Sequence, residues 1–146
     1  MEWVAALPAD VDPDLGKHCS CGFSLAMLVQ FYALADLIAE GGPLAVTEPV
    51  GMEVLAGARS DAGENDLRRL LLRIELVAVD PTADFEAAAR IYRQCRRTGV
   101  TPRGLIDCLI AAVAWRRGAT LLGQDVDLHS VADVIGVAMD APPERP

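Results

Sequence analysis

Three acidic residues lie where they could build a metal site. Glu53 and Asp107 fall in expected helices, and Asp125 directly follows a short apolar run that has the composition of a buried strand. In a parallel α/β sheet, ligands bind outside the carboxyl ends of the strands, so an acid after a strand and an acid at a helix start can face one crevice. Clustered carboxylates repel one another unless a cation lies between them, and oxygen ligands suit Mg²⁺ and Mn²⁺.

Each of these acids also has a simpler structural explanation. An acid early in a helix, such as Glu53 or Asp107, is favoured by the helix dipole and by free backbone N–H groups. Asp125 and Asp127 could both cap a following helix. Asp107, however, has mainly apolar neighbours, and a carboxylate in such surroundings needs a partner. This setting favours a metal ligand at Asp107, and the position directly after a strand favours one at Asp125.

The elements expected to position these acids alternate between strands and helices. Helices are predicted over 24–40, 49–57, 64–73, 81–98, 104–117 and 127–134, and strands over 44–47, 75–79 and 119–122. Alternation of this kind predicts an α/β fold, a three-layer sandwich around a mostly parallel sheet. Residues 1–7 are a doubtful first strand. We expect an atypical N-terminal segment over 1–23, one domain over 24–136 and a loose tail over 137–146.

Composition indicates a globular protein. The chain has 146 residues, of which 52% are hydrophobic and 23% charged, and this length predicts a single domain. The apolar window Leu25–Ala39 is too short and too polar to cross a bilayer, and the N-terminus has no signal-peptide pattern, so we expect a cytoplasmic protein with no membrane association. A zinc site from His18, Cys19 and Cys21 is disfavoured because no second ligand pair lies nearby. Cys95 and Cys108 fall on apolar helix faces, which suits free thiols.

Charge is unevenly distributed along the chain. The net charge is -8, which argues against coating nucleic acid by bulk attraction, yet 12 of the 13 basic residues are arginine. Arginine suits bidentate contacts with phosphate, and Arg103 and Arg116 flank the helix of Asp107, so they are the candidate contacts for RNA. The alternative is a solvated helix face combined with a bias toward arginine codons.

Three segments of the chain resemble the PIN-domain ribonucleases, and most closely the VapC-type toxins of bacterial toxin–antitoxin pairs. Thr47–Gly57 is similar to the family's helix that presents a glutamate. Asp107–Ala114, followed by Gly118–Leu122, is similar to its most recognisable motif. Asp125-Val-Asp127-Leu is similar to its closing acidic motif, with leucine in place of the usual phenylalanine.

The resemblance implies a metal-dependent endoribonuclease. Glu53, Asp107 and Asp125 would take the family's second, third and fourth acids and hold Mg²⁺ or Mn²⁺, with Asp127 as a further ligand. The reaction would be hydrolysis of RNA phosphodiester bonds, in which the cation stabilises charge and a carboxylate takes a proton from water. The implied partners are a VapB-like antitoxin and a second copy of the chain in a homodimer.

The N-terminus departs from the family pattern. The family's first strand ends in an aspartate that is commonly followed by Thr or Ser, and no such motif occurs here. The nearby acids are Asp10, Asp12 and Asp14, which lie in a run interrupted by prolines. We therefore expect weakened cleavage, with one of these acids as a substitute or residues 1–30 derived from a shifted frame. The alternatives are an inactive PIN-fold protein that only binds partners, and a gene product that folds poorly.

Overall fold

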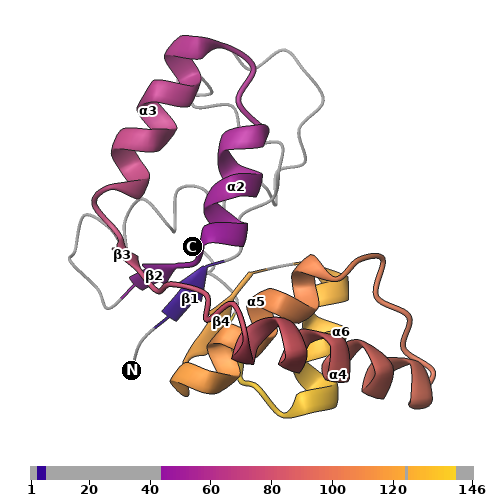
Figure 1. Cartoon of the computed structure of the whole chain (residues 1–146). Helices are drawn as coiled ribbons and strands as arrows, with labels where there is room; N and C mark the ends of the chain where they lie inside the picture. The colour runs from indigo at the N-terminus through magenta and orange to yellow at the C-terminus, as the bar shows by residue number, and fades with distance from the viewer. Residues whose placement is uncertain (1–2, 6–43, 124, 141–146) are drawn as a thin grey trace, which may run out of the picture.

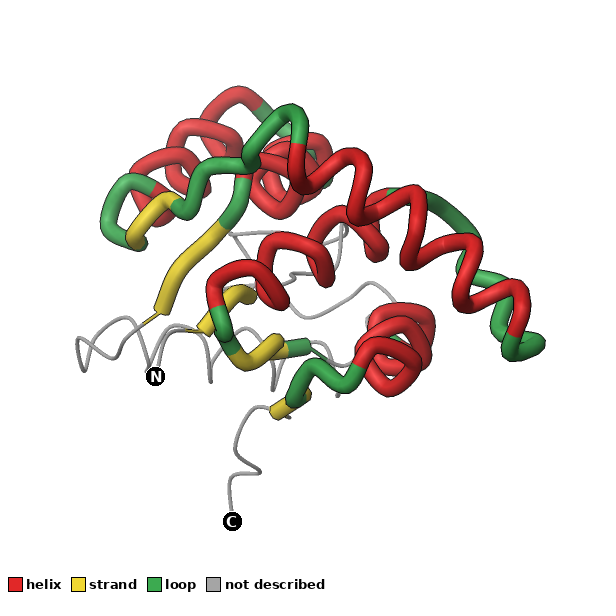
Figure 2. The backbone as a smooth tube through the Cα atoms, turned by 60° about the horizontal axis from the view of Figure 1, so that its bottom comes forward, coloured by secondary structure: helices red, strands yellow, loops and turns green. Residues whose placement is uncertain are grey.

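A five-stranded parallel sheet organises the molecule, in a computed structural model that describes residues 3–5, 44–123 and 125–140. The strands are β1 (Trp3–Ala5), β2 (Leu44–Val46), β3 (Glu75–Leu76), β4 (Thr120–Leu122) and β5 (Met139–Asp140), in the spatial order β3-β2-β1-β4-β5. Figure 2 shows them as one continuous row. The expected α/β fold with a parallel sheet is confirmed.

The sequence left the first strand in doubt, and the structure contains this strand as β1. β1 lies in the middle of the sheet, with Val4 paired to Ala45 of β2 on one side and to Leu121 of β4 on the other. The apolar run at the N-terminus therefore supplies the central strand despite its atypical sequence. The helix expected over 24–40 and the acids Asp10, Asp12 and Asp14 lie outside the described residues.

The C-terminal region also differs from the prediction. Residues 137–146 were expected to be a loose tail, but Met139–Asp140 form the edge strand β5, paired in parallel with Leu121 and Leu122. An edge strand needs only one row of hydrogen bonds, and two residues are too few for an alternating pattern to identify. At the opposite edge, β3 is also shorter than the five residues predicted, because only Glu75 and Leu76 pair with β2.

Helices α2 (Glu48–Ala56) and α3 (Asp61–Leu71) stand together on one side of Figure 1, apart from the remaining described helices. Pro49 lies in the first turn of α2, as predicted, where its missing N–H costs nothing. Helix α3 begins three residues earlier than predicted because Ser60 caps it, accepting a hydrogen bond from the Gly63 amide at 3.1 Å.

Helix α4 (Ala83–Arg97) buries only part of the apolar face that its sequence predicts, which comprises Phe85, Ala88, Ala89 and Tyr92. Ala88 is buried and Tyr92 partly buried, but Phe85 and Ala89 are exposed, and the buried face also includes Asp84, Ile91 and Cys95. The apolar pattern was misleading because the face that packs against the next helix includes a carboxylate. Asp80 precedes α4 and accepts hydrogen bonds from the amides of Thr82 and Ala83, so its predicted capping role is confirmed.

The core is built around helix α5 (Ile106–Arg117). Every residue from Cys108 to Ala114 is buried, so this helix is surrounded on all sides, and it ends at Gly118, whose φ of 62° is accessible to glycine at little cost. Helix α6 (Val126–Ile135) packs against both α4 and α5. No described helix is long and apolar enough to cross a membrane.

Candidate metal-binding active site

The predicted acids gather at one edge of the sheet. Helix α2 follows β2 and carries Glu53, while Asp125 lies three residues beyond the end of β4. The strand order reverses at β1, between β2 and β4, and a reversal of this kind opens a crevice at the carboxyl ends of the strands. Asp107, in the first turn of α5, faces the same region.

Three carboxylates form a compact group there. One oxygen from each of Asp107, Asp125 and Asp127 lies within 4.8 Å of the others. Asp125 is exposed, whereas Asp107 and Asp127 are partly buried. Since oxygen atoms at such separations can share one ion with bonds of about 2.0–2.6 Å, the group has the dimensions of a divalent-cation site.

Asp125 is held in place by the start of α6. Its Oδ1 accepts hydrogen bonds from the amides of Asp127 at 2.8 Å and Leu128 at 3.1 Å, so it is the N-cap of that helix. These bonds use Oδ1, so Oδ2 can serve a second partner. Capping and metal binding were alternatives when the sequence was considered alone, but the geometry permits both at once. Asp127 lies in the first turn of the same helix, and its backbone amide is held by the bond to Asp125.

Burial and like charge raise the pKa values of two acids at this site. Burial, followed by the charges of Asp125 and Asp127, raises the pKa of Asp107 to about 6, while Arg103 acts in the lowering direction. Burial also raises the pKa of Glu53, and the charges of Asp107 and Asp125 add to that rise. Glu53 is therefore close enough to feel the cluster, although it lies outside the tight group of three oxygens. Opposing charge from a divalent ion would reverse both shifts.

The two candidate RNA-contact arginines prove to have different environments. Arg103 lies beside the carboxylates, with its Nε 2.8 Å from Oδ2 of Asp127. Arg116 lies at the far end of α5, about 13 Å from Asp107 at 1.5 Å per helical residue. There it forms a bidentate ion pair with the buried Asp84 and donates to the Ala78 carbonyl. The position of Arg116 therefore argues against a role in RNA contact and gives it a structural one.

Asp84 and Thr47 are buried polar residues that the sequence analysis did not single out. Asp84 lies on the inward face of α4, four residues before the buried Ala88, and an acid at such a position signals a buried partner. Thr47 directly follows β2 and is fully buried, and its hydroxyl is the unpaired buried side-chain polar atom among the described residues. It lines a groove of about 410 Å³ between α2, α3 and the strands.

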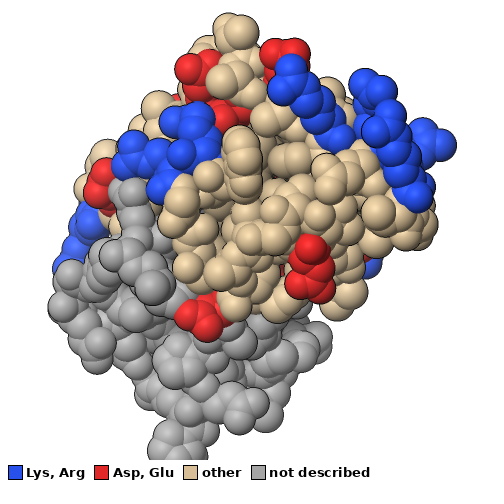
Figure 3. Space-filling model, turned by 90° about the horizontal axis from the view of Figure 1, so that it is seen from below, with Lys and Arg blue, Asp and Glu red and all other residues tan. Residues whose placement is uncertain are grey.

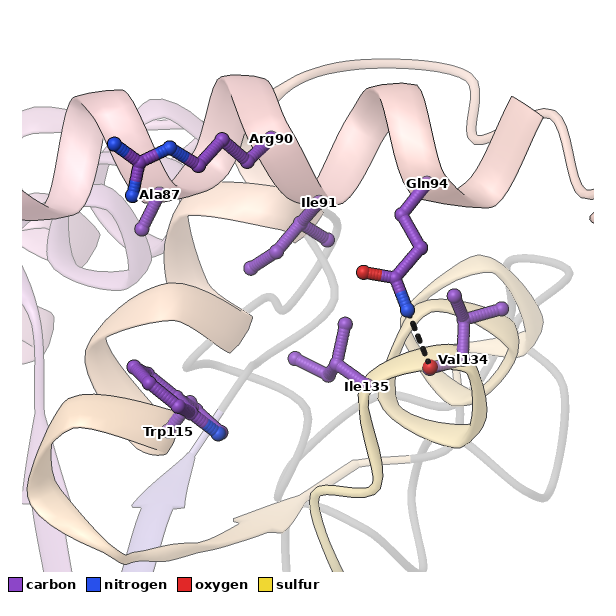
Figure 4. Close-up of a pocket in the computed structure, with 7 residues that line it drawn as sticks. All are labelled: Ala87, Arg90, Ile91, Gln94, Trp115, Val134 and Ile135. Atoms are coloured by element: carbon purple, nitrogen blue, oxygen red, sulfur yellow. Dashed lines mark hydrogen bonds between the residues drawn. The ribbon is translucent and has the colours of Figure 1, made fainter. Parts of the chain in front are cut away.

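A second groove, of about 280 Å³, lies between α4, α5 and α6 (Figure 4). Apolar side chains and Trp115 line it, and Gln94 donates a hydrogen bond to the Val134 carbonyl at its margin. Arg90 is its ionisable lining residue and is already paired with Glu86. None of the described residues that line this groove carries a carboxylate, so the acidic cluster remains the candidate for hydrolytic chemistry.

Comparison with known proteins identifies the family. The profile of the PIN domain matches residues 26–134. Ribonuclease VapC11 of Mycobacterium tuberculosis is 43% identical over 95 residues, which make up 65% of this chain and 71% of that protein.

Solved structures agree on the fold. VapBC2 from Rickettsia felis, bound to a DNA fragment from its promoter, has a TM-score of 0.66 at 15% identity and covers 97% of this chain and 98% of that one. VapBC-5 of Mycobacterium tuberculosis, a member of the VapBC family of toxin–antitoxin systems, has a TM-score of 0.52 at 24% identity and covers 67% of this chain and 79% of that one. The chain therefore belongs to the PIN-domain family, as a member similar to the VapC ribonucleases.

Proposed function

We propose that this protein is an endoribonuclease toxin that hydrolyses RNA phosphodiester bonds with a divalent cation, Mg²⁺ or Mn²⁺. The observation that carries the proposal is the convergence of Asp107, Asp125 and Asp127 on one site in a member of a ribonuclease family. Their side chains supply only oxygen ligands, which suits Mg²⁺ and Mn²⁺ better than softer metals. Asp107 is partly buried and its pKa is raised to about 6, so a bound cation would offset a charge that its surroundings otherwise disfavour.

The residues divide the chemistry among themselves. When bound, the cation supplies positive charge that stabilises the phosphorane-like transition state and makes water a better nucleophile. Asp107 and Asp125 anchor it, and Asp127 completes the ligand set. Glu53 lies beyond the tight group with a raised pKa, so it is suited to accept a proton from the attacking water.

Arginine supplies the attraction for RNA that the net charge does not. Figure 3 shows basic side chains in groups at the margins of one face, around a largely uncharged centre. Because Asp84 at the start of α4 contacts Arg116 at the end of α5, the two helices run antiparallel. Arg96 and Arg97 at the end of α4 are exposed and contribute to the basic charge of the surface.

A VapB-like antitoxin is the proposed protein partner, supported by the similarity to structures from VapBC pairs. The groove between α2, α3 and the strands offers an apolar surface lined in part by Leu55, Leu71 and Ile74, and Leu72 and Leu76 are 81% and 58% exposed there. An antitoxin arginine placed over the cluster would pair bidentately with a carboxylate and block the cation. Calorimetry of the chain with the product of the adjacent gene tests this pairing, and no binding would contradict it.

A homodimer is also proposed from the family resemblance. Exposed apolar side chains on α4 and α5 support it, since Phe85 is 58% and Trp115 is 63% exposed. Light scattering after size exclusion should give twice the monomer mass of 15.6 kDa. If a Trp115→Arg variant stays dimeric, the dimer interface lies on another surface.

Cleavage of single-stranded RNA with Mn²⁺ is the decisive test of the nuclease. We expect weakened but measurable cleavage by the chain, and Asp107→Asn to remove it. If the chain and Asp107→Asn have equal rates, the inactive alternative that retains only partner binding takes its place. A substitute for the family's first acid is proposed among the acids that follow β1, so Asp10→Asn, Asp12→Asn and Asp14→Asn should be compared singly. The variant that loses activity identifies the substitute.

A further inference from the structure

Arg103 is the basic residue nearest to the acidic cluster for which the structure gives a direct contact. It precedes α5 by three residues, and its Nε lies 2.8 Å from Oδ2 of Asp127. The Arg103 side chain is 85% exposed, whereas that of Asp127 is 21% exposed. The arginine therefore reaches from solvent to a carboxylate at the cluster margin, and little else restrains it.

The same carboxylate belongs to the proposed cation site. Asp127 contributes an oxygen to the group with Asp107 and Asp125, and Oδ2 is the atom that Arg103 contacts. A guanidinium held on that oxygen and a divalent ion among the same carboxylates repel each other. The two cations therefore compete for Asp127, directly or through charge. An ion pair with one exposed partner is worth at most about 1 kcal/mol, so a divalent ion can displace the arginine.

We propose that Arg103 is an internal counter-ion of the cluster, which the metal displaces and an RNA phosphate then captures. The inference rests on the proposed function. Without the cation, the guanidinium neutralises part of the negative charge at Asp127. With the cation bound, the freed guanidinium stays at the mouth of the site, where it can hold a phosphate by two N–H···O bonds beside the ion. Arg103 thus positions the substrate and takes no proton.

The first test measures cation affinity without RNA. Mn²⁺ binding at pH 7.5 is followed by calorimetry in the wild type, Arg103→Gln, Asp107→Asn and Arg93→Gln. Arg93→Gln is the matched control, since it removes the same charge from an exposed site on α4. Loss of the competing ion pair should tighten Mn²⁺ binding about two- to fivefold in Arg103→Gln. Arg93→Gln should leave it unchanged.

The outcomes separate the two proposals. If Mn²⁺ binds the wild type but not Asp107→Asn, and Arg103→Gln binds no more tightly than the wild type, the counter-ion inference fails and the metal site stands. If Arg93→Gln tightens binding as much as Arg103→Gln does, the effect is net charge and the inference also fails. If the wild type binds no better than Asp107→Asn, both proposals fail.

The second test measures the coupling between cation and RNA. The affinity for a short single-stranded RNA is determined with and without Mn²⁺ at low temperature, and a gel confirms that the RNA remains intact. Mn²⁺ should strengthen RNA binding in the wild type, and this gain should shrink at least threefold in Arg103→Gln but not in Arg93→Gln. An equal gain in the wild type and both variants would overturn the inference.

Discussion

The two ends of helix α5 place a carboxylate in opposite electrostatic environments. At the C-terminal end, Asp84 from α4 is 1% exposed and fully engaged, with both oxygens on Arg116 and a further bond from the Asp80 amide. At the N-terminal end, Asp107 faces two more aspartates, and its pKa rises to about 6. Asp84 is fully paired with a guanidinium of the chain, whereas Asp107 lies beside two further carboxylates and the nearby Arg103 contacts Asp127.

The paired carboxylate stabilises the fold, whereas the clustered carboxylates are suited to binding a cation. A buried acid with an internal guanidinium links elements, and here Arg116 joins α5 to the start of α4 and to the Ala78 carbonyl. A buried acid beside other acids destabilises the fold until something positive arrives from outside. If this interpretation is correct, substitutions at the two ends should fail in opposite ways, one losing activity and the other losing stability.

The largest expected effect is at Asp107. Asp107→Asn should lower RNA cleavage about 1000-fold, since removal of one group that stabilises transition-state charge typically costs 100- to 1000-fold and a ligand also holds the ion. The same variant should melt at or above the temperature of the cation-free wild type, because it removes the repulsion. Initial rates with Mn²⁺ and thermal melts without it check both statements. A variant that is inactive because it has unfolded would contradict the comparison.

Arg116 should show the reverse behaviour. Arg116→Met leaves Asp84 buried without its cation, and breaking a buried pair costs about 3–5 kcal/mol, reduced to about 2–3 here because Arg116 is partly exposed. Urea unfolding monitored by circular dichroism measures the loss. Arg69→Met is the control, since the ion pair of Arg69 with Asp66 is long, at 3.4 Å, and joins two exposed side chains. Comparable losses in the two variants would show that the buried pair of Arg116 and Asp84 stabilises the fold no more than a surface ion pair does.

Much of the fold could be predicted because local signals and packing agree. Pro49 and Gly118 mark the ends of α2 and α5, and the apolar run at β4 is typical of a buried parallel strand. The prediction failed where tertiary pairing decides the structure. β1 and β5 are short segments that are strands only because β2 and β4 pair with them. The inward face of α4 was misassigned because the sequence does not show that Asp84 meets Arg116.

The site was predicted in part for a similar reason. Asp107 and Asp125 follow from position alone, because acids at a helix start and after a strand meet at one sheet edge. Sequence could not distinguish the two candidate arginines, since both are equally basic and the partners of each come from other elements. Only the contacts show that one faces Asp127 and the other faces Asp84.

Protonation of Asp107 should make cation binding at the cluster depend on pH. The pKa of Asp107 in the cation-free fold is about 6, above the ordinary value of 3.8, so its ionised form is disfavoured there. The resulting loss of folding stability is fully present above pH 6 and absent below pH 3.8. Cation binding needs the ionised form, so Mn²⁺ affinity should be flat from pH 7 to 8 and fall about tenfold per pH unit below 6. Calorimetry across this range tests the slope. A fall that begins only near pH 4 would remove Asp107 from the ligand set.

The smallest expected effect distinguishes the two roles of Asp125. Its Oδ1 caps α6 through the amides of Asp127 and Leu128, and the second oxygen is assigned to the cation. Asparagine retains a capping oxygen but loses the charge, whereas alanine loses both. Asp125→Asn should therefore change the free energy of unfolding by less than about 0.5 kcal/mol and Asp125→Ala should lower it by about 1 kcal/mol, while both weaken Mn²⁺ binding equally. Equal stability in the two variants would show that the cap is dispensable, and Mn²⁺ binding that survives in Asp125→Asn would show that Asp125 caps the helix without holding the ion.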